Sequence, residues 1–207
     1  MLTSFLEKIP QRIQYMNRRK AVKKILLLGG GAAIGYSGIK GYNLFKNPDI
    51  GLLNQSVSLL NELAETIIPV TANEPGAKSA NAGSFIVKMI SDCSSRKNQN
   101  NFIDGIKDVI QYSMFNYYKP FEECSMTEKN NILQHFEKKG KFSTELFNKA
   151  NRFIFGDSFF YTLKKYTVLG FCNSKIGATQ ALSYDYLPGK YIASKALLPN
   201  QKGWATF

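Results

Sequence analysis

The chain has 207 residues, of which 44% are hydrophobic and 13% are aromatic, and its formal net charge is +12. This length and composition exclude a disordered chain and suffice for one domain with a genuine core. The charge argues against a nucleic-acid-binding surface, because it is concentrated at the start of the chain. Residues 1–24 contain seven basic residues and one acidic residue, whereas residues 47–207 contain 18 basic and 14 acidic residues. The body therefore has no basic stripe dense enough to follow a phosphate backbone.

An arginine pair, Arg18 and Arg19, stands before the segment at residues 25–39, which is uncharged and rich in glycine. A basic region followed by such a segment has the layout of a secretory signal. Paired arginines are typical of the twin-arginine route, which exports folded proteins, and Lys23 also fits that motif. Residues 1–46 are therefore predicted to be a twin-arginine-type signal, and the protein is predicted to be periplasmic.

The same segment leaves open whether the mature protein stays attached to the membrane. Residues 25–39 are shorter than the about 20 apolar residues that a bilayer-spanning helix needs. No Ala-x-Ala cleavage site follows them, so a short membrane anchor is an alternative to a cleaved signal. Both Met1 and Met16 are compatible with the start of such a signal.

Beyond the signal, apolar residues recur three and four positions apart, which predicts amphipathic helices around one core. Ser125 and Glu128 have the spacing of a capping box at the start of one of these helices. Residues 47–207 are therefore predicted to form a single all-α domain of about six helices. These helices are expected at about residues 51–68, 85–93, 102–117 and 126–138, from about residue 143, and at about residues 159–169.

From Gly170 to the end of the chain the helical pattern breaks. Glycine, proline and asparagine recur there, so this stretch is predicted to be a long irregular tail. The tail is nevertheless rich in aromatic residues, which must pack on something. Either it wraps around its own helices, or it presents an aromatic surface to another subunit, because Tyr and Trp are enriched at interfaces. The aromatic residues are Phe171, Tyr184, Tyr186, Tyr191 and Trp204.

The three cysteines, Cys93, Cys124 and Cys172, are far apart in the sequence. No pair has the Cys-x-x-Cys spacing of a zinc cluster, so no metal site is predicted. In an exported protein, two of the cysteines could form a disulfide and leave one free thiol. The alternative is that all three are small buried residues.

No group of residues is predicted to carry catalysis. His135 is the only histidine, and a single histidine on a helix is more often structural than catalytic. Glu122 and Glu123 are adjacent, so on a helix their side chains would point apart. The sequence also lacks a Gly-x-Ser-x-Gly elbow and a haem-attachment motif. We therefore assign no catalytic, cofactor-binding or metal-binding residue in this chain.

Two motifs in the body are specific when they occur together, namely Leu63-Ala-Glu-Thr-Ile-Ile-Pro69 and the block from Leu169-Gly to Ile176-Gly-Ala-Thr. Further matching segments are residues 75–78, 85–86, 92–93 and 188–191. With this combination the chain resembles the gluconate 2-dehydrogenase subunit 3 family over residues 51–204.

The resemblance implies a small subunit of a periplasmic dehydrogenase whose large subunit contains FAD and is of the glucose-methanol-choline type. The small subunit of such an enzyme is thought to stabilise the large one and to carry it through the twin-arginine translocase. Electrons often pass to a cytochrome c, and the substrate would be a sugar, polyol or sugar acid. The candidate contacts with the large subunit are Phe171, Gly177, Ala178, Thr179, Gln180, Leu182, Tyr184 and Tyr191.

Two other functions stay open at this point. A free-standing periplasmic enzyme would be active in isolation, through catalytic residues that form no familiar motif. A membrane-anchored structural protein would retain residues 25–39 in its mature form.

Overall fold

The computed structural model describes the body of the chain and parts of its C-terminal segment, namely residues 46–141, 145–183, 189, 194, 196, 199 and 201–204. All of them belong to one compact unit, residues 42–207. The predicted signal residues Arg18, Arg19 and Lys23 lie outside the described residues, as do the segment 25–39 and the candidate contacts Tyr184 and Tyr191.

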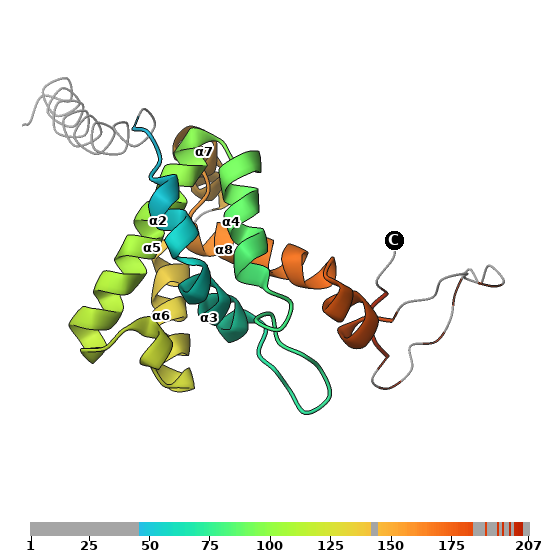
Figure 1. Cartoon of the computed structure of the whole chain (residues 1–207). Coiled ribbons are helices and arrows are strands. Elements are labelled where there is room, and N and C mark those ends of the chain that lie inside the picture. The colour runs from blue at the N-terminus through green and yellow to red at the C-terminus, as the bar shows by residue number, and fades with distance from the viewer. Residues whose placement is uncertain are drawn as a thin grey trace, which may run out of the picture. The chain divides into compact units, whose positions relative to one another are not determined.

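The regular secondary structure of these residues is helical, and the predicted all-α fold is confirmed (Figure 1). In chain order the elements are α2 (Ile50–Gln55), α3 (Val57–Ile67), α4 (Ala82–Cys93), α5 (Arg96–Tyr117), the 3-10 helix η1 (Phe121–Glu123), α6 (Met126–Lys139), α7 (Glu145–Phe155), α8 (Phe159–Cys172) and the π-helix η2 (Gly177–Ala181).

The prediction of one helix over residues 51–68 is wrong, because Ser56 divides it into α2 and α3. The Ser56 hydroxyl donates a hydrogen bond to the carbonyl oxygen of Leu52 at 2.8 Å. Its backbone N–H bonds to the carbonyl oxygen of Leu53, only three residues earlier, at 3.1 Å. Local bonds of this kind compete with the regular helical ladder. The short α2 is also capped at its start by Asp49, which accepts from the Leu52 N–H at 3.0 Å.

The ends of the other helices follow from local chemistry. α6 begins with the predicted capping box, in which the Ser125 hydroxyl accepts from the Glu128 N–H and the Glu128 carboxylate accepts from the Ser125 N–H at 2.7 Å. α7 ends at Phe155, and the next residue, Gly156, has a φ of +91°, a left-handed conformation that glycine adopts without strain. α5 begins six residues before the predicted position 102, at Arg96, because its first turns are polar and give no apolar period.

The core is centred on α8, which packs against α3, α4, α5 and α6. At its start, the Phe159 ring lies 5.2 Å from the Phe102 ring and 5.9 Å from the Phe136 ring, measured between centroids. Gly105 lets α5 approach this ring, because a Cβ there would lie 2.3 Å from Phe159 Cγ. The fully buried side chains of this core include Leu53, Leu60, Leu63, Ile86, Ile90, Ile103, Ile106, Val109, Ile132 and Leu163.

The tail from Gly170 is helical in its first part, which corrects the prediction of an irregular segment throughout. α8 continues to Cys172, and η2 adds a π-helical turn beyond it (Figure 1). Gly170 interrupts the apolar pattern of α8 because α4 packs closely against this position. A Cβ there would lie 2.6 Å from the Phe85 ring of α4. Further on, the Ser183 N–H donates to the carbonyl oxygen of Gly203 at 2.7 Å, so residues 201–204 return to the end of η2.

Candidate functional site

The loop between α3 and α4 is shaped by Glu65, the acidic residue of the Glu-Thr-Ile-Ile-Pro motif. Its two carboxylate oxygens accept hydrogen bonds from the backbone N–H groups of Val70 and Lys78, each at 2.8 Å. Gly76 leaves room for this carboxylate, because a Cβ there would lie 2.2 Å from a Glu65 oxygen and would displace it. We name this arrangement the Glu65 clamp. It accounts for the joint occurrence of segments 63–69 and 75–78, because both serve the geometry of one loop.

Glu62, one turn before Glu65 on α3, connects the same loop to α6. Its carboxylate accepts one hydrogen bond from Lys78 and another from Lys129 of α6, the latter at 2.8 Å. Lys129 is only 7% exposed, and its ammonium lies 5.6 Å from the centre of the Phe121 ring. Burial raises the pKa of Glu62, but the two lysines outweigh it and hold this pKa below its usual value. Glu62 is therefore ionised at neutral pH, within a structural ion-pair network.

The second motif, residues 169–182, forms the turn from α8 into η2. The Ser174 hydroxyl donates to the carbonyl oxygen of Phe171 at 2.7 Å and accepts from the Gly177 N–H at 2.9 Å. A Cβ on Gly177 would lie 1.9 Å from the same carbonyl oxygen, so the turn has no room for a side chain. Like the Glu65 clamp, this motif fixes the path of the backbone.

The candidate contacts in this segment are divided between core and surface. Phe171, which is 6% exposed, packs into the hydrophobic core, and Gly177 is buried in the turn. The other described candidates are Ala178 and Leu182, which are half-buried, and Thr179 and Gln180, which are exposed. The surface that η2 offers to a partner is therefore the side that carries Thr179 and Gln180.

One side of α8 is exposed along its length, with residues that recur three and four positions apart. We name this side the α8 face, and it consists of Tyr161, Lys164, Lys165, Val168 and Leu169. Three of these side chains are large and apolar, and Tyr161, Val168 and Leu169 are 41%, 43% and 39% exposed. α8 leads toward η2 (Figure 1), and the exposed residues extend along it from Tyr161 to Leu169. Single apolar residues are ordinary on a protein surface, but a stripe of them favours an interface.

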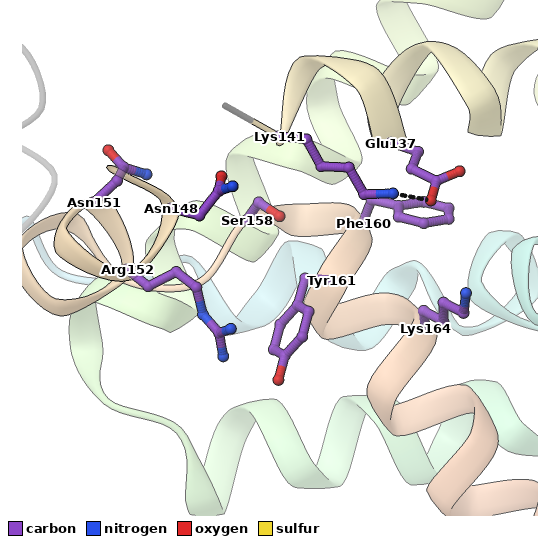
Figure 2. Close-up of a pocket in the computed structure, with 10 residues that line it drawn as sticks. Glu137, Lys141, Asn148, Asn151, Arg152, Ser158, Phe160, Tyr161 and Lys164 are labelled. Carbon is purple, nitrogen blue, oxygen red and sulfur yellow. Dashed lines mark hydrogen bonds and ion pairs between the residues drawn. The ribbon is translucent and has the colours of Figure 1, made fainter. Parts of the chain in front are cut away.

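A pocket of about 460 Å³ opens between the end of α6, one side of α7 and the start of α8. Figure 2 shows the side chains of the three helices that converge on it. Its lining includes Glu137, Lys141, Asn151, Arg152, Tyr161 and Lys164.

Two ion pairs form at this pocket. Lys141 donates to the Glu137 carboxylate at 2.6 Å (Figure 2), and this bond holds the pKa of Glu137 below its usual value. Arg152 donates through Nε to the Asp157 carboxylate at 2.9 Å, which raises the pKa of Arg152. The guanidinium carbon of Arg152 also lies 4.0 Å from the centre of the Tyr161 ring, a cation–π contact. The pocket wall is thus both charged and aromatic.

The remaining residues singled out from the sequence lie elsewhere. His135 is exposed on α6 and stacks on Tyr112 of α5, with ring centroids 4.4 Å apart. Glu122 and Glu123 are exposed in η1. Among the described residues, no three His, Cys, Asp or Glu side chains are grouped so that they could hold a metal ion. Within that same part of the chain, no helix combines the length and apolar character needed to cross a bilayer.

The three cysteines are free thiols in different surroundings. Cys93 is exposed, Cys124 is buried and Cys172 is half-buried. Burial raises the pKa of the Cys124 thiol. Of the three cysteines, only Cys124 fits the alternative prediction from the sequence, that of a small buried residue.

Sequence reasoning missed the pocket. On α7 a signal exists, because Asn148, Asn151 and Arg152 are three and four positions apart and therefore share one side of the helix. That spacing could have indicated a polar face directed at a neighbouring element. The contributions of α6 and α8 have no such signal, because they depend on how the three helices pack.

The fold and its two motifs define a class of protein: a small all-α body in which the motif residues fix one loop and one turn. Residues 54–189 match the family model described as gluconate 2-dehydrogenase subunit 3, and the chain belongs to this family. The matched region includes both the Glu65 clamp and the turn at Gly177. No match was found among curated proteins or among solved structures. The family is that of a dehydrogenase subunit, which implies association with other subunits of a dehydrogenase complex.

Proposed function

We propose that this chain is the small, non-catalytic subunit of a periplasmic dehydrogenase. It binds and stabilises a large FAD-dependent subunit of the glucose-methanol-choline type, which oxidises a sugar, polyol or sugar acid. The flavin and the chemistry belong to that partner, whose electrons pass to a cytochrome c. Membership of the gluconate 2-dehydrogenase subunit 3 family is the observation that carries this proposal.

The α8 face and the exposed side of η2 are the surface that we assign to the large subunit. The apolar side chains of the α8 face lose their contact with water when a partner covers them, which favours association. A stable interface buries about 800 Å² on each partner. One helix face is smaller than that, so we expect the partner to cover Thr179, Gln180 and Trp204 as well. Trp204 is 53% exposed, and tryptophan is enriched among residues that dominate binding energy.

The arginine pair gives this subunit its second task, the export of the assembled complex. The twin-arginine route carries folded proteins, so one signal suffices for two chains that have already associated. Arg18, Arg19 and Lys23 would then serve a partner that has no signal of its own.

Association is tested by purifying the tagged full chain from its host under mild conditions. We expect a large flavoprotein to co-purify in fixed stoichiometry, recognised by the flavin absorption spectrum. Recovery of the chain as a lone monomer would count against the proposal, as would sugar-dependent reduction of an electron acceptor by the chain alone.

Export is tested by Arg18→Lys together with Arg19→Lys, which keeps the charge but removes the guanidinium groups. Both this chain and the large flavoprotein should then accumulate in the cytoplasm. Arg12→Lys is the matched control, because it makes the same replacement outside the pair, and it should leave export intact. Continued export of the flavoprotein in the double variant would refute the escort role.

A further inference from the structure

α7 directs its polar side at the body and its apolar side at solvent. Asn148 lines the pocket, and Arg152 extends from α7 to the Tyr161 ring of α8 (Figure 2). On the other side of the helix, the side chains of Phe153 and Ile154 are 84% and 53% exposed. A surface helix ordinarily buries its apolar side, so this orientation is reversed. We name the exposed apolar side the α7 face, and it consists of Ala150, Phe153 and Ile154.

The polypeptide around α7 carries the net charge of the body. Residues 138–152 contain five basic residues and one acidic residue, whereas the rest of residues 47–207 contains 13 of each. All five basic side chains are exposed, and they are Lys138, Lys139, Lys141, Lys149 and Arg152.

The ion pairs of these residues do not cancel the charge. Four of the five pair with a carboxylate, in contacts that water still reaches and that therefore bind weakly. Lys97 of α5 adds a further ammonium, which donates to the carbonyl oxygen of Phe153 at 2.8 Å. With the four carboxylates included, six basic groups thus stand against four acidic ones. This part of the body therefore attracts an anionic surface.

The end of α7 lies beside the point at which the N-terminal segment joins the body. The carbonyl oxygen of Lys46, the first described residue, accepts from the Asn100 side chain at 2.8 Å. Asn101, the next residue of α5, donates to the carbonyl oxygen of Phe155 at the end of α7 at 2.7 Å. Seven peptide units lead from position 39 to position 46 and span at most about 25 Å. An anchor at residues 25–39, the alternative to a cleaved signal, would therefore hold α7 close to a membrane.

We propose that the α7 face docks on the surface of an anionic lipid bilayer. Phe153 and Ile154 enter the boundary between the headgroups and the acyl chains, and the basic side chains of residues 138–152 interact with lipid phosphates. Large apolar side chains on one side of a helix, with basic residues beside them, are typical of such contacts. The polar side of α7 stays on the body, so the helix docks as it is folded. This contact goes beyond the proposed function and leaves the α8 face free for the large subunit.

A tryptophan reporter on α7 tests this contact in the full chain. Trp204→Phe removes the only tryptophan of the sequence, and Phe153→Trp then places a single reporter on the α7 face. Without lipid, its emission should be that of an exposed indole. On vesicles of phosphatidylglycerol and phosphatidylcholine, the emission should shift to the blue, and lipids with brominated acyl chains should quench it. Vesicles of phosphatidylcholine alone should give a smaller shift, because they lack the negative surface potential.

Phe115→Trp in the same Trp204→Phe background is the matched control. Phe115 is 78% exposed but lies on α5 about 20 Å along the helix from Asn101, which holds the end of α7. Its emission should not respond to the anionic vesicles. Equal shifts and equal quenching at the two positions would overturn the inference, because the bilayer would then not select α7.

Phe153→Ser together with Ile154→Ser should reduce partitioning onto the anionic vesicles at least about tenfold, because two large apolar side chains no longer enter the bilayer. Ile110→Ser together with Phe115→Ser removes side chains of similar exposure from α5 and should leave partitioning within about twofold of the wild type. Vesicle cosedimentation measures both, and far-UV circular dichroism establishes that each variant is folded. Unchanged partitioning of the α7 variant, together with an unshifted reporter, would overturn the inference.

Other occupants of the α7 face give different results. A reporter whose emission is already shifted to the blue without lipid would show that residues 25–39 or a second copy of the chain cover the face, and would overturn the inference. So would an α7 variant that keeps its vesicle binding but loses the large flavoprotein, because the face would then belong to that subunit. Loss of the vesicle contact alone leaves the proposed function standing, because flavoprotein association is measured without lipid.

Discussion

Gly177→Ala tests whether the second family motif fixes the backbone. A Cβ at this position would lie 1.9 Å from the carbonyl oxygen of Phe171 and 2.8 Å from its carbonyl carbon. Both are backbone atoms, so the clash is relieved only if the turn opens. Opening the turn breaks the two hydrogen bonds of the Ser174 hydroxyl and displaces Phe171 from the core.

The expected loss of stability follows from these contacts. Overpacking of a fitted site costs about 1–3 kcal/mol, and each lost hydrogen bond costs about 1 kcal/mol. With two hydrogen bonds lost, we therefore expect Gly177→Ala to lower the free energy of unfolding by about 3–5 kcal/mol. With a urea dependence of about 2 kcal/mol per molar, the unfolding midpoint should fall by about 1.5–2.5 M.

Two signals separate local from global unfolding. Far-UV circular dichroism follows the helices, and the fluorescence of Trp204 follows the C-terminal segment, because Trp204 is the only tryptophan and forms a bridge with Ser183. Both midpoints should shift if the turn unfolds with the body. Gly189→Ala is the matched control, since a Cβ there has no atom within 4 Å. If Gly177→Ala and Gly189→Ala both unfold like the wild type, the structural role of Gly177 is refuted.

Three further changes test the rest of the body. Glu65→Gln replaces one acceptor oxygen by an NH₂ donor that faces a backbone N–H, so it should lower the free energy of unfolding by about 1–3 kcal/mol. It should also speed hydrogen exchange of the backbone amide of Val70 or Lys78, and unchanged exchange at both would contradict the clamp. Because the folded-state pKa of Glu62 is lowered, its contribution to stability is complete above the unfolded value near 4.5 and is lost as the pH falls below it. The urea unfolding midpoint, measured from about pH 3 to 7, should therefore fall in acid, and it should fall less steeply in Glu62→Gln than in the wild type. An equal pH dependence in the two proteins would exclude this contribution of Glu62. Ser125→Ala removes the cap of α6 and should lower the free energy of unfolding, measured in urea, by about 1 kcal/mol. An unchanged unfolding midpoint would show that the capping box adds nothing to stability.

The helical body could be predicted from the sequence because most of its helices have a buried apolar side. Ile86 and Ile90 on α4, and Ile132 with Phe136 on α6, show the spacing that such packing requires. The first turns of α5 were missed because they are polar. The extension of α8 was missed because Gly170 reads as a helix breaker, whereas its role depends on the Phe85 ring of another helix.

The sites were predicted less well, for a related reason. The motif residues of the turn at Gly177 were found by resemblance, but the resemblance does not separate contact residues from residues that fix the backbone. Burial separates them, since Phe171 faces the core while Thr179 and Gln180 face solvent. The pocket needed the packing of α6, α7 and α8, which no local pattern contains.

The two family motifs act at the same end of the α4–α8 pair. The Glu65 clamp fixes the loop that leads into α4, and Phe85 in the first turn of α4 packs against Gly170, immediately before the turn at Gly177. A change in the loop would therefore displace α4. Because α4 packs against Gly170, this displacement would also change the orientation of the end of α8 and of η2 after it. Holding that segment in one orientation reduces the ordering that a partner must impose on binding. Motif residues that never touch the partner can thus be as necessary for assembly as the exposed residues of the α8 face.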